Sequence, residues 1–300
     1  MAAERAWRGG TDGTKWMHRN LVRIVRHVPL RLMYGFVAVF VVPFYFLFSK
    51  GYKPIYHYFN QRLGYRPAKA FFGVYRNFCR FSQVILDRFY MFGGGKFDVQ
   101  VEKYHLYQEL AEGEPGFMIL SAHVGNYELA GFSLVATKKR FNALAFGEEA
   151  EAIMENRERL FAGTNINIIP VKDDLSHLFA LNNALDNGES VSFPSDRLLG
   201  NQRTVTCEFL GAPAHFPMGP FALAAQRDLP VLTVNVMKES AKRYRVYVNR
   251  LQKEGTTRGE RINAYVRQYV EHLEEVLRKY PEQWFNYYEF WGDERTMKER

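Results

Sequence analysis

FMILSAHVGNYELAG, the stretch from Phe117 to Gly131, holds the pattern that decides the fold. An apolar run leads directly into His123, and a Gly-Asn pair then opens a segment that contains Glu128. Short apolar runs that alternate with stretches of helical spacing are typical of an α/β domain. We therefore expect a strand that ends just before His123 and a helix that begins just after it.

The same alternation continues on both sides of this stretch. Strands are predicted at residues 117–122, 141–146, 166–171, 190–193, 205–209, 231–236 and 245–249. Helices are predicted at residues 67–92, 127–137, 149–161, 175–186, 219–227 and 258–279. The predicted fold class is α/β, with a mixed sheet flanked by helices. Residues 93–300 are expected to form the catalytic domain, and residues 1–92 a basic, aromatic-rich helical region that associates with a membrane.

Charge is distributed unevenly along the 300 residues, which carry a net charge of +8. Residues 13–86 contain twelve Lys and Arg but no Asp or Glu, which leaves a net charge of −4 for the rest of the chain. A protein that wraps nucleic acid would spread basic residues over its whole surface. A basic N-terminal quarter on an acidic body instead favours a local encounter with anionic lipid headgroups.

An uncharged run of eighteen residues, 32–49, lies inside this basic quarter. A membrane-spanning helix needs about 20 apolar residues, so the run is at the lower limit of length. Pro43 and Gly35 make it equally compatible with a kinked segment in the membrane interface. Both arrangements stay open. The seven Lys and Arg before the run favour a cytoplasmic N-terminus.

His123 and Glu128 are the candidate catalytic pair. On a continuous helix, two side chains five residues apart diverge by about 140°, so His123 is expected in the turn before the helix. From there Glu128 would bind one ring nitrogen while the other faces substrate. An imidazole held in this way can remove the proton of an acceptor hydroxyl or amine while that hydroxyl or amine attacks a thioester carbonyl.

The segment resembles the late acyltransferases of lipid A biosynthesis and their lysophospholipid acyltransferase relatives. Their shared signature is a His, four intervening residues and then Asp or Glu, which is how His123 and Glu128 are spaced. Blocks in the family's order follow at residues 188–200, 205–232 and 281–290, so the resemblance covers most of the chain. It implies a glycerolipid acyltransferase-like fold with an N-terminal hydrophobic membrane-anchoring helical segment.

The resemblance also implies further site residues. Arg159, or failing it Arg157, would hold the acceptor phosphate or the developing oxyanion, and Asp196 would position an Arg or the acceptor. Asn126 is a further candidate for substrate binding. Arg157 and Arg159 stand beside Glu155 and Glu158, and such a charged run is equally often only a solvated helix face, so the two arginines keep that alternative.

The implied reaction moves a fatty acyl chain from acyl carrier protein or coenzyme A to a lipid acceptor, at the cytoplasmic face of the inner membrane. A lipid A precursor is one acceptor among aminoacyl, glycosyl and phospholipid alternatives. No cofactor is expected, and the scattered histidines show no metal-ligand spacing. Two other functions stay open: a lipid hydrolase that uses the same His123 and Glu128, and a non-catalytic module that binds lipid at the membrane surface.

Overall fold

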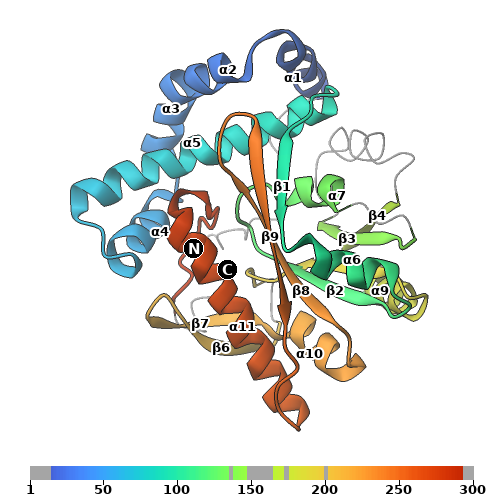
Figure 1. Ribbon diagram of the computed structural model, residues 1–300. Helices are drawn as coiled ribbons and strands as arrows, with labels where there is room; N and C mark the ends of the chain where they lie inside the picture. The colour runs from blue at the N-terminus through green and yellow to red at the C-terminus, as the bar shows by residue number, and fades with distance from the viewer. Residues whose placement is uncertain (1–14, 135–137, 147–164, 172–175, 199–201, 293–300) are drawn as a thin grey trace.

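A seven-stranded sheet forms the centre of the computed structural model, which describes residues 15–134, 138–146, 165–171, 176–198 and 202–292 (Figure 1). The strand order is β1-β9-β8-β2-β5-β3-β4, and all neighbours are parallel except β8 and β9. The strands are β1 Asp98–Glu102, β2 Phe117–Ser121, β3 Phe141–Phe146, β4 Ile166–Val171, β5 Ser190–Pro194, β8 Val231–Lys238 and β9 Arg243–Leu251. The prediction of a mixed sheet flanked by helices is confirmed.

Two strands were not predicted from the sequence. β1 is a short, partly exposed strand at the sheet edge, where burial imposes no long apolar run. β7, Ala212–Pro217, pairs with β6, Thr204–Phe209, in an antiparallel hairpin outside the main sheet. Its two prolines argue against a central strand, and an edge position tolerates them.

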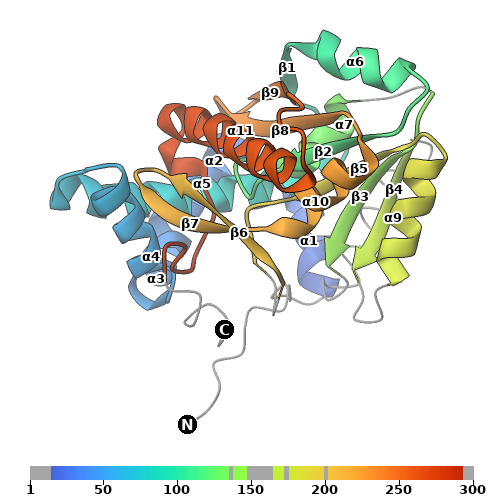
Figure 2. The ribbon, with the colours of Figure 1, turned by 90° about the horizontal axis from the view of Figure 1, so that it is seen from below.

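Two helical layers cover the sheet, and the side chains of β2 show how they are separated. Met118 and Leu120 lie in one buried cluster with residues of three helices, α9 (Ser176–Asp186), α10 (Met218–Arg227) and α11 (Arg258–Lys279). Phe117 and Ile119 lie in a second cluster with α6, Tyr104–Glu112, and α7, Ala130–Ser133. Successive residues of a strand face opposite sides, so both faces of β2 are buried. Figure 2 shows α9 beside β4 at one end and α6 beside β1 at the other.

The helix predicted at residues 127–137 is present from Tyr127 to Ser133, and residues 135–137 lie outside the described residues. Residues Tyr127–Leu129 form a 3-10 turn, and α7 continues it for a single turn that ends at Ser133. The backbone of Leu134 then leaves the helical region, with φ −103° and ψ 66°. Its amide still donates to Ala130 O at 2.8 Å. The helix predicted at residues 149–161 lies outside the described residues.

The N-terminal region consists of helices that pack along α5, Pro67–Phe92 (Figure 1). They are α1 Lys15–His27, α2 Leu30–Phe36, α3 Val42–Phe48 and α4 Tyr52–His57. A π-helical turn, Val37–Val41, joins α2 to α3, and Val42 N donates to Val37 O. Pro43 has no N–H to continue the α-helical pattern here, which is a physical reason for the wider turn. The predicted apolar run is thus one helical stretch, Leu30–Phe48.

The main buried cluster extends across the boundary expected near residue 93. Val42, Phe59 and Val74 from the N-terminal region lie in the same cluster as Met118 and Leu120 of β2. The division into residues 1–92 and 93–300 stays a prediction about organisation, and the two parts share one core.

Candidate active site

Two neighbouring parallel strands bring His123 and Asp196 together. β2 and β5 are in register, with Ser121 opposite Pro194. His123 follows Ser121 by two residues, and Asp196 follows Pro194 by two residues. Because the carboxyl ends of parallel strands lie at the same edge of a sheet, residues just beyond those ends meet there. The sheet register therefore sets this pair.

The Asp196 carboxylate receives three hydrogen bonds. Its Oδ1 lies 2.6 Å from His123 Nδ1, and its Oδ2 accepts from His123 N at 2.9 Å. The indole of Trp284 donates to Oδ2 at 3.2 Å. The Asp196 side chain is completely buried, whereas 15% of the His123 side chain is exposed. The contacts of His123 with Asp196 involve its backbone N and its ring Nδ1, and among the described residues no hydrogen bond to Nε2 is present.

The turn after His123 is held by backbone hydrogen bonds from two directions. Asn126 N donates to Val236 O of β8 at 2.8 Å, and Phe285 N donates to His123 O at 2.9 Å. Gly125 has φ +51°, and a Cβ atom there would lie 1.9 Å from Val236 O. A residue other than glycine would therefore collide with the strand as well as strain the turn. This close approach explains the glycine of the HVGN sequence.

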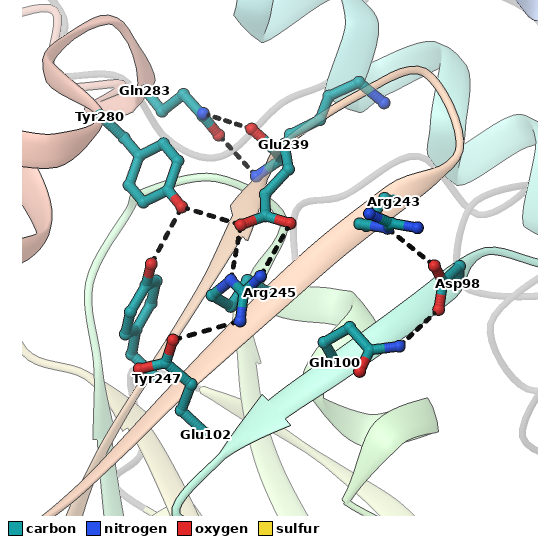
Figure 3. Close-up of polar contacts among 10 residues, drawn as sticks. Asp98, Gln100, Glu102, Glu239, Arg243, Arg245, Tyr247, Tyr280 and Gln283 are labelled. Carbon is teal, nitrogen blue, oxygen red and sulfur yellow. Dashed lines mark hydrogen bonds and ion pairs between the residues drawn. The ribbon is translucent and has the colours of Figure 1, made fainter.

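The C-terminal segment that supports this turn is itself bound to the end of β8 (Figure 3). Lys238 N donates to Gln283 Oε1 at 2.9 Å, and Gln283 Nε2 donates back to Lys238 O at 2.8 Å. Beside them Arg245 Nε donates to Glu239 Oε1 at 2.5 Å. Gln283 O in turn accepts from Gly125 N at 2.9 Å. Residues far apart in the sequence thus fix the position of His123.

Burial and charge act in opposite directions on the pair. Burial lowers the pKa of His123 and outweighs the Asp196 charge, which raises it; the nearby Arg197 lowers it further. Burial alone would raise the pKa of Asp196, but the charge of His123, its hydrogen bonds and Arg197 hold that pKa below its ordinary value. At neutral pH the pair is therefore a neutral imidazole beside a carboxylate. This is the state that a general base requires.

Glu128 does not bind the His123 ring, and this corrects the predicted pairing. Asp196 already occupies Nδ1, and the Glu128 carboxylate lies 2.8 Å from Arg88 NH2 of α5. Both side chains of this ion pair are largely buried, with 11% of Arg88 and 9% of Glu128 exposed. The 3-10 turn that carries Glu128 places its side chain toward α5, which helical geometry assumed from the sequence did not foresee.

The other predicted residues lie in different situations. Asn126 is buried; its backbone carbonyl accepts from Leu129 N at 3.1 Å, and its side-chain Nδ2 has no partner among the described residues. Arg157 and Arg159 lie outside the described residues. No group of three or more His, Cys, Asp or Glu side chains with metal-binding proximity occurs in the described part of the chain.

Two contributions to the site were missed by sequence reasoning. Arg88 reads as one more polar position on an amphipathic helix, and only tertiary contacts reveal its pairing with Glu128. Asp196 was considered for an Arg or the acceptor, not for the imidazole. The sequence did contain a signal for the contact between Asp196 and His123. Each residue comes two positions after an apolar strand, and the two strands could be neighbours in the sheet.

Comparison with known proteins adds independent findings. The family model described as bacterial lipid A biosynthesis acyltransferase matches residues 95–291. Among solved structures, the chain is similar to 1-acyl-sn-glycerophosphate acyltransferase from Thermotoga maritima, with 14% identity and a TM-score of 0.38. That similarity covers 88% of this chain and 98% of the other. A search of curated proteins finds no match.

Proposed function

Because this chain belongs to the bacterial lipid A biosynthesis acyltransferase family, we propose that it transfers a fatty acyl group from an acyl thioester to a hydroxyl or amine of a lipid acceptor. The observation that carries the proposed mechanism is the contact between His123 Nδ1 and Asp196 Oδ1 at 2.6 Å. It selects the imidazole tautomer and leaves Nε2 available to the acceptor.

Proton transfer follows from this tautomer. Asp196, as a carboxylate, accepts the Nδ1–H, so the lone pair of the neutral ring is on Nε2. Nε2 removes the proton of the acceptor hydroxyl or amine as its oxygen or nitrogen attacks the thioester carbonyl. A C–O or C–N bond forms, the C–S bond breaks, and the imidazolium returns the proton to the leaving thiolate. The buried Asp196 charge stabilises the imidazolium while it exists.

Glu128 has a second proposed catalytic role, now separate from the ring of His123. Its carboxylate is oriented by Arg88 and follows His123 by five residues, close to the reacting centre along the chain. From this position it would orient the acceptor by accepting a hydrogen bond. Asn126, Arg157 and Arg159 remain proposed substrate-binding residues, the two arginines for phosphate or oxyanion.

The proposal places the protein at the cytoplasmic face of the inner membrane, with acyl carrier protein or coenzyme A as the donor carrier. The helical stretch Leu30–Phe48 has a mean hydropathy of 1.9, and only 17% of it is buried within the protein. The surrounding residues 13–86 bear twelve basic side chains and no acidic ones. An apolar surface surrounded by positive charge favours contact with anionic lipid.

The test is a transfer assay with the purified full chain, labelled acyl thioester and membrane lipid. We expect a labelled acyl-lipid from the unsubstituted protein, and a loss of about 10²- to 10⁴-fold in His123→Ala. His57→Ala is the matched control, since His57 also binds a carboxylate, Glu289 Oε1, at 2.9 Å but is 41% exposed. Release of free fatty acid alone would indicate a hydrolase, and no turnover would indicate a lipid-binding module. Near-normal transfer by His123→Ala contradicts the mechanism.

A further inference from the structure

The stretch Leu30–Phe48 exposes large apolar side chains although it is attached to the rest of the protein. Eight of these side chains are more than half exposed, among them Leu32, Phe36, Phe40, Phe44 and Leu47 at 65%, 59%, 68%, 64% and 74%. The face is long and continuous along the helical stretch. Contiguous apolar surface of this extent on a folded protein marks a binding surface.

The opposite face of the same stretch is bound to α5 at separate positions. Tyr34 OH donates to Asp87, and Tyr75 OH donates to Ala38 O at 2.6 Å. The ring of Phe46 packs against α5 as well, with its centroid 5.0 Å from that of Phe71 and 5.8 Å from that of Tyr75. Figure 1 shows α2 and α3 lying alongside α5. The stretch is therefore attached to α5 along its length.

α5 in turn is tied to the catalytic part of the molecule by polar groups. Asp87 forms an ion pair with Lys238 of β8, and both side chains are completely or almost completely buried. Asn77 Nδ2 donates to Trp284 O at 2.8 Å, and Arg88 binds Glu128. Charged and amide groups of this kind are costly in hydrocarbon. α5 cannot enter the bilayer without separating these contacts, so a helix packed along α5 cannot cross the bilayer in this conformation.

We propose that Leu30–Phe48 does not span the membrane but lies flat on one leaflet. Its exposed face enters the boundary between the headgroups and the acyl chains of that leaflet, and α5 lies on the side away from the membrane. The occupant of this face is an anionic phospholipid surface, because the exposed residues Arg31, at the start of the stretch, and Lys53, just after it, are basic, and no acidic residue occurs in residues 13–86. This inference rests on the membrane association in the proposed function and decides its geometry.

A flat arrangement has a consequence for the active site. α5 contacts the apolar stretch on one side, and Asn77 binds the backbone of Trp284, whose indole donates to Asp196. The His123–Asp196 pair is therefore connected to the membrane-facing surface by packed, hydrogen-bonded elements rather than by a tether. Such a connection keeps the catalytic pair at a set height and orientation over the leaflet that contains the acceptor.

The two arrangements are distinguished by labelling on either side of the stretch. Arg23→Cys and Lys53→Cys, each in a chain whose Cys79 and Cys207 are replaced by alanine, are expressed and examined in sealed inverted membrane vesicles. Both native positions are exposed. A flat segment leaves both cysteines open to a membrane-impermeant maleimide to the same extent without detergent. Labelling of one flank only after detergent is added shows a spanning helix and overturns the proposal.

A second measurement tests which surface binds. Phe40→Glu should weaken co-sedimentation of the purified chain with phosphatidylglycerol-containing vesicles about tenfold, because it replaces an inserted ring with a charge. Phe179→Glu is the matched control, since Phe179 is 74% exposed on α9, and it should bind as the unsubstituted chain does. Equal binding by the three proteins overturns the assignment of the face. Acyl transfer by the cysteine-free chain is measured separately, so a spanning result with intact transfer contradicts the geometry and leaves the reaction standing.

Discussion

Asp196→Asn is the substitution that tests the proposed base most directly. The two side chains have the same shape, so the buried site keeps its packing while the charge is lost. In the native site both carboxylate oxygens accept hydrogen bonds, Oδ2 from His123 N and Trp284 Nε1 and Oδ1 from Nδ1. The asparagine oxygen would remain with the two N–H donors, which places its NH2 group against Nδ1. The ring must then accept at Nδ1 and carry its proton on Nε2.

A ring with its proton on Nε2 cannot take one from the acceptor. We expect kcat to fall by about 10²- to 10⁴-fold, the usual contribution of a positioned general base. Loss of a charge-assisted hydrogen bond costs about 1.5–3 kcal/mol, part of which is offset because a buried charge is removed. The free energy of unfolding should therefore fall by only about 1–2 kcal/mol. Activity and stability respond to very different extents.

The assay is initial-rate acyl transfer, with thermal unfolding of the same samples and Asp98→Asn as the control. Asp98 is an exposed carboxylate bound to Arg243, so its substitution should leave both quantities near the native values. The reasoning is refuted if Asp196→Asn transfers acyl groups within a few-fold of the native rate. It is also refuted if the loss of activity is explained by unfolding at the assay temperature.

The pH dependence of the native protein adds a check on the same pair. The pKa of His123 is lowered from 6.5, first by burial, so the ring becomes a neutral base at a pH below that value. The acidic limb of kcat/KM should have its midpoint below pH 6.5. The effect on stability has the same direction. Between the folded pKa of His123 and 6.5 the unfolded chain binds more protons than the folded one, so the contribution of His123 to the free energy of unfolding is lost as pH falls through that window. A midpoint above 6.5 contradicts this electrostatic account.

Two further substitutions test contacts that only the fold reveals. Arg88→Ala should lower kcat/KM about tenfold, because Glu128 loses a largely buried charge partner, and Arg88→Lys should restore part of the lost kcat/KM. Arg76→Ala breaks an exposed ion pair on the same helix and should leave kcat/KM unchanged. Steady-state kinetics of the three variants measures these effects. Lys238→Met should lower the free energy of unfolding by about 3–5 kcal/mol, because Asp87 is left buried without its charge partner. The double variant Lys238→Met with Asp87→Leu should recover much of that loss. Chemical denaturation of both variants measures the two values.

The local pattern of the chain was sufficient for most of the elements. Every strand predicted in the main sheet is present, because apolar runs between polar turns reflect burial that the sequence itself encodes. The helix predicted from Tyr127 begins as a 3-10 turn and ends at Ser133, since local spacing shows neither the type of the first turn nor where a helix ends. The edge strand β1 was missed because an exposed edge needs little apolar character.

The sequence by itself determined that His123 follows a buried strand, that Glu128 comes five residues later, and that the basic N-terminal quarter contains an apolar run. Only the tertiary structure decided which carboxylate binds the imidazole, because that depends on β2 and β5 being neighbours in register. It also decided that Glu128 belongs to Arg88 of α5. His123 and Asp196, 73 positions apart, meet because the pairing of β2 with β5 brings the carboxyl ends of these two strands together. Local sequence spacing does not show which strands pair.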